Sequence, residues 1–166
     1  RVAEMTNPPV AAGSGPSTEA PWRLLAYDKP LGRGAGTGPG QFRHPSFCAL
    51  LERPEGGLVV SDSFNGRLQL RDADGNWTPL SNGLGFANPR GVACDPGYIY
   101  VVEGSNGAIS GSGGLQKLTL DGKPVLTRRA ATANGENAAA GGDAGLQWPQ
   151  GVALAGSILF VADSHN

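Results

Sequence analysis

A unit that recurs three times is the feature that most restricts what this chain can fold into. The copies read HPSFCALLERPEGGLVVSDSFN (44–65), NPRGVACDPGYIYVVEGSN (88–106) and WPQGVALAGSILFVADSHN (148–166). Each contains a proline, two short apolar runs separated by a turn, and an acidic residue three positions before an asparagine. Such repetition predicts stacked supersecondary units, because one unit cannot bury both of its faces alone.

The repeated unit extends to four expected strands. In the first copy we expect strands at roughly 46–51, 58–61, 67–71 and 77–80, and in the second at roughly 91–94, 98–102, 115–120 and 124–127. Asp74-Gly75 and Asp121-Gly122 suit the tight turns between the third and fourth strands. Four-stranded antiparallel sheets repeated along a chain predict the blades of a β-propeller.

Composition agrees with a turn-dense all-β protein. The 166 residues include 27 Gly and 13 Pro, and 13 basic residues face 14 acidic ones. The near-zero net charge argues against a protein that binds nucleic acid through a strongly basic surface. No apolar run is long enough to cross a membrane, so we expect no membrane segment, and a cytoplasmic location is favoured. Cys48 and Cys94 lie in apolar runs and are expected to be buried thiols.

The sequence resembles the NHL-repeat family of propellers. The resemblance rests on GTGPGQFRHP (36–45), VVSDSFNGRLQLRDADG (59–75), NPRGVACD (88–95) and WPQGVAL with FVADSHN (148–166). It implies a partial propeller of about two and a half four-stranded blades that ends within a blade, as a fragment of a longer protein would. We therefore expect a flexible Pro/Ala/Gly-rich segment at 1–20 and a propeller segment at 21–166. Its repeats would span about 40–80, 84–127 and 144–166.

The polar corner after each second strand favours a structural role over a catalytic one. Asp, Ser and Asn side chains stabilise turns by binding nearby backbone groups, and an element present in every copy is typical of a scaffold. Asp62, Asn65, Asp163 and Asn166 are therefore interpreted as turn residues. The glycine-rich run at 32–40 lacks the ending of a phosphate loop and is interpreted as a connection.

Histidine is too scarce for a predicted metal site. Only His44 and His165 are present, whereas zinc normally takes three or four protein ligands. We predict no catalytic residue, no metal ligand and no cofactor. A metal-dependent lyase or hydrolase of the propeller type remains an alternative, and it would require Zn or Ca.

The most plausible working surface is the rim where corners and connections of a propeller gather. Arginine, aromatic and amide side chains are typical of binding surfaces. The sequence thus favours a non-catalytic scaffold that binds a protein partner through these loops. Binding of single-stranded RNA is the alternative within the family. The candidate rim residues are Arg43, His44, Phe64, Asn65, Arg67, Arg90, Asn106, Gln150 and His165.

Overall fold

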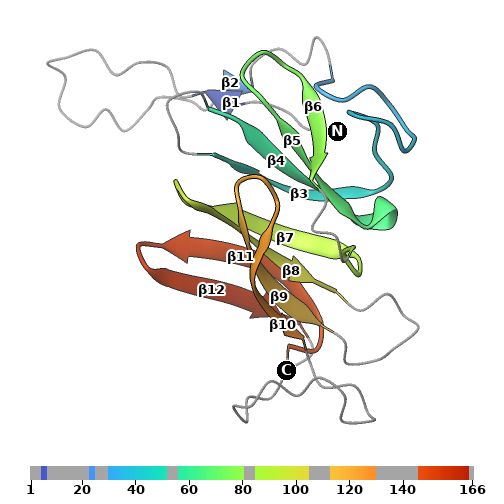
Figure 1. Cartoon of the computed structure of the whole chain (residues 1–166). Helices are drawn as coiled ribbons and strands as arrows, with labels where there is room; N and C mark the ends of the chain where they lie inside the picture. Colours follow the sequence, from blue (N-terminus) through green and yellow to red (C-terminus); the bar gives the residue numbers. More distant parts are fainter. Residues whose placement is uncertain are drawn as a thin grey trace, which may run out of the picture.

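The computed structural model is all-β, with antiparallel pairing between its strands and a single 3-10 turn, η1 (Ser63–Asn65), in the part that it describes (Figure 1). Two short strands near the start, β1 (Met5–Thr6) and β2 (Arg23–Leu24), pair with each other. The other described residues are 30–51, 56–80, 85–104, 113–129 and 146–164.

The first sheet contains four strands in chain order. They are β3 (Pro45–Leu50), β4 (Leu58–Asp62), β5 (Arg67–Arg71) and β6 (Trp77–Leu80). The four strands predicted for the first repeat are thereby confirmed to within one residue at each end.

The second sheet repeats the same plan. It consists of β7 (Pro89–Cys94), β8 (Tyr98–Glu103), β9 (Gly114–Thr119) and β10 (Pro124–Arg129). The glycines of the two Asp-Gly turns, Gly75 and Gly122, have φ of 90° and 88°, a region that only glycine adopts freely. A third unit follows as the hairpin of β11 (Pro149–Ala155) and β12 (Ile158–Asp163).

The three units have the same register at their first hairpin. Pro45 lies opposite Asp62, Pro89 opposite Glu103 and Pro149 opposite Asp163. In each hairpin the register shifts immediately after the proline, as in a β-bulge. The recurring letters in the sequence therefore correspond to equivalent places in three hairpins.

The units pack through their first and second strands. β3 and β4 contact β7, and β7 and β8 contact β11, so the first strands lie side by side (Figure 1). The core fills the space between the first two sheets, and its fully buried members include Val59, Leu68, Ile99, Val101 and Leu118. Burying one such side chain stabilises a fold by about 1.5–3 kcal/mol.

β7 and β11 approach each other closely at a pair of glycines. A Cβ added at Gly91 would lie 2.7 Å from the Cα of Gly151 and 2.7 Å from the backbone nitrogen of Val152. The corresponding position of β3, two residues after its proline, holds Phe47. Glycine thus permits a backbone contact between units two and three that a larger residue would prevent.

The expectation that both cysteines are buried is wrong for Cys48. Its side chain is exposed on β3, while Cys94 on β7 is half-buried and packs against the core. The difference arises because Cys94 lies on the side of β7 that faces the first sheet, whereas no sheet among the described residues covers the side of β3 that bears Cys48. No helix in the described residues has the length and apolar character needed to cross a membrane.

Candidate functional site

The acidic residue of each repeat fastens the two ends of its hairpin together. The carboxylate of Asp62 accepts a hydrogen bond from the backbone nitrogen of Arg43 at 2.7 Å. Glu103 accepts one from Ala87 at 3.1 Å, and Asp163 accepts one from Gln147 at 2.8 Å. Each donor lies two residues before the proline, so the repeated acid holds the chain as it enters the first strand.

Two of these acids are also paired with buried glutamines. Gln69 Nε2 donates to Asp62 at 3.2 Å, and Gln116 Nε2 donates to Glu103 at 2.8 Å. All four side chains are buried. A buried carboxylate requires such donors because its desolvation is costly. The glutamines were not predicted, although each is the third residue of the third strand of its unit, which was a usable signal.

Arg67, predicted to lie on the binding rim, is engaged by its own chain. Its Nε donates to Asp62 at 2.8 Å, and its two Nη atoms donate to the carbonyl oxygens of Thr37, Gly38 and Gln41. The side chain therefore ties the glycine-rich connection to the first sheet. Asn65 has a similar role, since its Nδ2 donates to Asp62 and to the carbonyl of Gly36.

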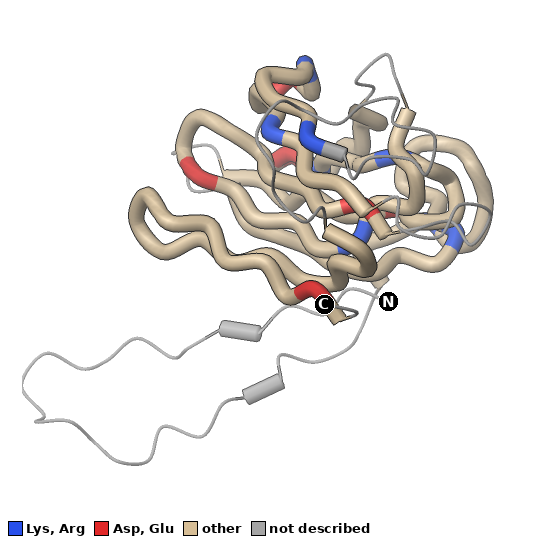
Figure 2. The backbone as a smooth tube through the Cα atoms, turned by 90° about the horizontal axis from the view of Figure 1, so that it is seen from below, with Lys and Arg blue, Asp and Glu red and all other residues tan. Residues whose placement is uncertain are grey.

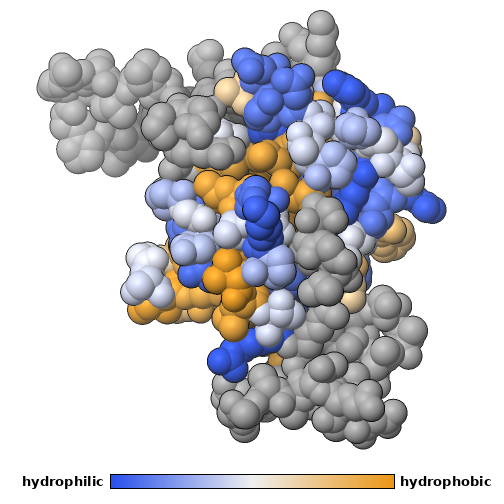
Figure 3. Space-filling view, viewed as in Figure 1, coloured by the Kyte–Doolittle hydropathy of each residue, from blue (hydrophilic) through white to orange (hydrophobic). Residues whose placement is uncertain are grey.

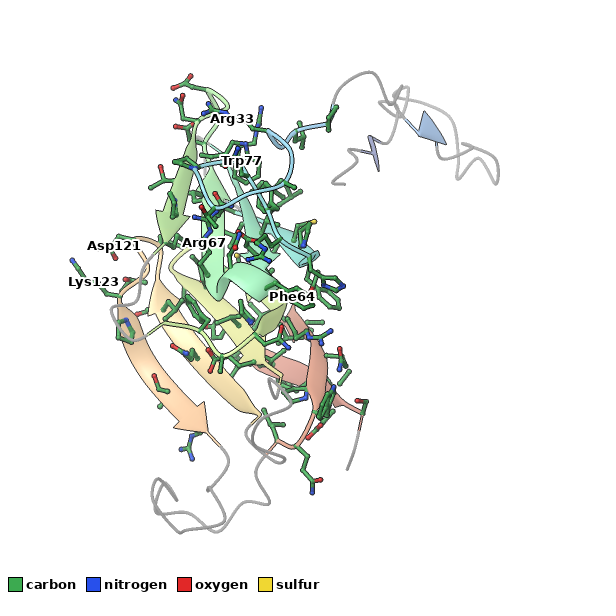
Figure 4. The ribbon with its side chains drawn as sticks, turned by 90° about the vertical axis from the view of Figure 1, so that its right-hand side faces the viewer. Arg33, Phe64, Arg67, Trp77, Asp121 and Lys123 are labelled. Atoms are coloured by element: carbon green, nitrogen blue, oxygen red, sulfur yellow. The ribbon has the colours of Figure 1, made fainter. Side chains whose placement is uncertain are left out.

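The exposed part of the predicted rim centres on an aromatic pair. The rings of His44 and Phe64 stack with centroids 4.6 Å apart and an angle of 12° between their planes. Phe64 is 65% exposed and projects from the corner, whereas Arg67 points into the first sheet (Figure 4). The neighbouring Arg43 is exposed as well. We call the surface formed by Arg43, His44 and Phe64 the aromatic corner.

Several hydrogen bonds hold the aromatic corner in place. The backbone nitrogen of Phe64 donates to the carbonyl of Arg43 at 3.1 Å. The hydroxyl of Ser63 is 2.5 Å from that of Ser46 and donates to the carbonyl of Pro89 at 2.6 Å. His44 itself has φ of 55°, a left-handed conformation uncommon for a residue with a side chain. The pair is thus positioned by backbone and by contact with the second sheet.

The remaining candidates lie beside the second sheet or outside the described residues. Arg90 Nη1 donates to Gln150 Oε1 at 3.3 Å, which links β7 to β11, and both side chains are half-buried. The Ser61 hydroxyl donates to the carbonyl of Arg90 at 2.5 Å, so this pair adjoins the first sheet. Asn106 and His165 lie outside the described residues.

A second polar cluster lies at the far end of the β7–β8 hairpin. Asp95 accepts hydrogen bonds from the backbone of Gly97 and Tyr98 and from the hydroxyl of Tyr100. Lys117 Nζ lies 3.7 Å from the centroid of the Tyr98 ring. Partial burial raises the pKa of Asp95, but these hydrogen bonds and the charge of Lys117 lower it by more, so the net shift is downward. These contacts stabilise the turn between β7 and β8.

Charge is distributed without a basic stripe along the described chain. Lysine and arginine positions lie on several elements and are interspersed with aspartate and glutamate (Figure 2). Within the described ranges, no three histidine, cysteine, aspartate or glutamate side chains gather in a group that could hold a metal ion.

Comparison with known proteins does not assign the chain to a family. Neither a scan against protein-family models nor a search of curated proteins found a match to the sequence.

Proposed function

We propose that the chain is a run of NHL-type propeller blades that acts as a non-catalytic scaffold and binds a protein partner at the aromatic corner. Three equivalent hairpins, fastened by the same acid and packed through their first strands, support the propeller architecture. The resemblance in sequence supports its assignment to the NHL type.

The observation that carries the binding role is the exposed His44–Phe64 stack. An aromatic side chain that is 65% exposed contributes little to folding, and rigid aromatic residues beside an arginine are typical anchors of protein interfaces. Because hydrogen bonds to Arg43 and Pro89 already fix the corner, a partner would meet a preformed surface. Little ordering entropy would then be lost on binding.

Single-stranded RNA is the second candidate ligand. The same stacked rings next to Arg43 could receive an unpaired base and a phosphate. The scattered basic positions favour the protein partner over RNA, because RNA binding without a basic groove is weak.

Quantitative affinity capture with three forms of the chain tests the proposal. We expect the wild type and Lys123→Glu, altered on the exposed turn before β10, to retain the same proteins. Phe64→Asp should lose them, because the anchor is replaced by a charge. Identical capture by all three forms would contradict the protein-binding role. Salt-dependent binding of a mixed-sequence single-stranded RNA, lost in Phe64→Asp, would instead favour the RNA candidate.

A further inference from the structure

The three arginines predicted for the binding rim differ in how far the chain itself uses them. Every nitrogen of the Arg67 guanidinium donates a hydrogen bond, to Asp62 or to a backbone carbonyl. Arg43 and Arg90, by contrast, form no ion pair with any carboxylate among the described residues. Arg67 is therefore part of the fold, whereas the other two arginines have charge to offer to a ligand.

The guanidinium of Arg90 has unused donors although the residue is half-buried. Among the described residues its one hydrogen bond runs from Nη1 to the neutral amide oxygen of Gln150, at 3.3 Å. Its Nε is buried and has no hydrogen-bond partner in that part of the chain. A cation that is partly removed from water is unfavourable unless an opposite charge or hydrogen bonds compensate it. An anion bound beside Arg90 would supply that compensation.

Arg43 is held by its backbone and presents its side chain to solvent. Its nitrogen donates to Asp62 at 2.7 Å, and its carbonyl accepts from the nitrogen of Phe64 at 3.1 Å. The residue is exposed, and its guanidinium contacts no hydrogen-bond partner within the described ranges. The position of Arg43 on the surface is thus fixed, while its charged group is available.

The two arginines adjoin the same turn. Arg43 binds the backbone of Phe64 on η1, as described above. The Ser63 hydroxyl, also on η1, donates to the carbonyl of Pro89, the residue before Arg90, at 2.6 Å. The aromatic corner therefore has one arginine on the connection into β3 and a second at the start of β7.

The acids of the first two units are already engaged and cannot serve these arginines. The buried carboxylate of Asp62 binds Arg67, and that of Glu103 binds the backbone of Ala87 and the side chain of Gln116. The described part of the chain thus provides no carboxylate for Arg43 or Arg90. Charge complementarity requires an anion from a ligand.

The apolar part of the surface is the ring of Phe64. His44 stacks on it with 12° between the ring planes, so the imidazole covers one face of the ring. Because Phe64 is 65% exposed, the other face is open to a second flat side chain. At the right of the space-filling view, where this corner lies, a small apolar patch borders strongly hydrophilic surface (Figure 3).

We propose that the aromatic corner binds an acidic peptide segment of its partner. Carboxylates of the segment pair with Arg43 and Arg90, and a neighbouring aromatic side chain stacks on the open face of Phe64. Arginine suits this role because its guanidinium binds a carboxylate through two parallel hydrogen bonds. The inference rests on the proposed function, since it specifies the partner of that same surface. Two arginines without a basic groove favour such a segment over the phosphates of RNA.

Selection from a phage-displayed library of random heptapeptides tests the proposal. The complete chain is immobilised, and peptides that also bind Phe64→Asp are removed by counter-selection. We expect the retained peptides to be enriched in Asp or Glu next to Trp, Tyr or Phe. In fluorescence polarisation, replacement of the acids of a retained peptide by their amides should weaken its binding to the unaltered chain about tenfold.

Two variants of the chain identify the residues that receive the acids. Arg43→Gln and Arg90→Gln should each weaken binding of the acidic peptide about tenfold and leave binding of its amide form nearly unchanged. Circular dichroism confirms that each variant is folded, and the amide peptide tests the charge without altering the chain. Lys123→Gln, which removes a cation from the exposed turn before β10, is the matched control and should bind like the wild type.

The outcomes separate this inference from the proposed function. Retained peptides without acids would overturn the acidic partner while leaving Phe64 as the binding site. Equal binding of every selected peptide to wild type and Phe64→Asp would contradict both. If the library yields no acidic peptide and a mixed-sequence single-stranded RNA binds through Arg43 and Arg90, the corner recognises RNA and the inference is wrong.

Discussion

The Nε of Arg67 lies 2.8 Å from a carboxylate oxygen of Asp62 that is completely buried. The rest of the guanidinium binds three backbone carbonyls of the connection that covers the first sheet. One side chain thus compensates a buried charge and fastens the segment that lies over it.

Replacement of Arg67 by lysine should destabilise the fold although the charge is kept. An ammonium group cannot bind the carboxylate and three carbonyls in this planar arrangement, and a buried group left without its hydrogen bond costs about 1–3 kcal/mol. We expect a lower midpoint in urea unfolding followed by circular dichroism. Lys123→Ala, which removes the solvent-exposed pair with Asp121, is the control and should leave the midpoint unchanged.

Gly91→Ala should weaken the packing of the third unit on the second. The new methyl group would meet backbone atoms of β11 at 2.7 Å, and overpacking of this kind costs about 1–3 kcal/mol. In hydrogen exchange, the substitution should accelerate the opening of the β11–β12 amides, relative to the wild type, more than that of the amides in β4. Gly151→Ala is the matched control, since its Cβ would meet only Ala162 at 3.8 Å. Equal effects of the two substitutions would contradict the backbone contact.

Ser63→Ala should loosen the junction between the two sheets. The substitution removes the hydroxyl that donates to the buried carbonyl of Pro89. Loss of this hydrogen bond should lower the free energy of unfolding by about 1–3 kcal/mol. Ser164 follows the acid of the third unit as Ser63 follows Asp62, but it is exposed. Ser164→Ala should therefore lower the free energy of unfolding by less, and the reverse order would argue against a stabilising bond at Ser63.

Asp95 should contribute a pH-dependent part of the stability. Its pKa in the folded chain is below the ordinary value of 3.8, so its carboxylate stabilises the fold at every pH above that value. This contribution is lost as the pH falls from about 4 through the lowered pKa. The difference in urea midpoint between wild type and Asp95→Asn should therefore shrink from about pH 7 to about pH 2.5. A constant difference would contradict this role.

The strands and turns were predictable because their signals are local. Alternating apolar residues, Asp-Gly pairs and the regular spacing from proline to acid placed two four-stranded sheets within a residue or two. A structural role for Asp62 was expected from the same reasoning, but its carboxylate binds the backbone of Arg43, 19 residues away, and does not cap its own turn. The propeller arrangement and the NHL type stay predictions.

What the sequence did not reveal depends on neighbours far along the chain. Gln69 and Gln116 are polar in a strand, which normally indicates a solvent-facing position, yet their partners are buried acids. Arg67 is of a residue type that is common at binding surfaces. Only its hydrogen bonds to residues 37–41 show that it holds the glycine-rich connection. Leu50 and Cys48 belong to an apolar run that predicts burial, but burial requires a covering element that periodicity cannot report.

The fastening of each hairpin at its proline end has a practical consequence for engineering. The spacing from proline to acid is 17 residues in the first unit and 14 in the others, yet pairing continues up to Leu50 opposite Leu58, Cys94 opposite Ile99 and Ala155 opposite Ile158. The loop at the opposite end therefore tolerates changes in length in the first unit, whereas Asp95 holds that loop in the second. Epitope tags or fluorophore sites belong there, where they would report on the molecule without disturbing the aromatic corner.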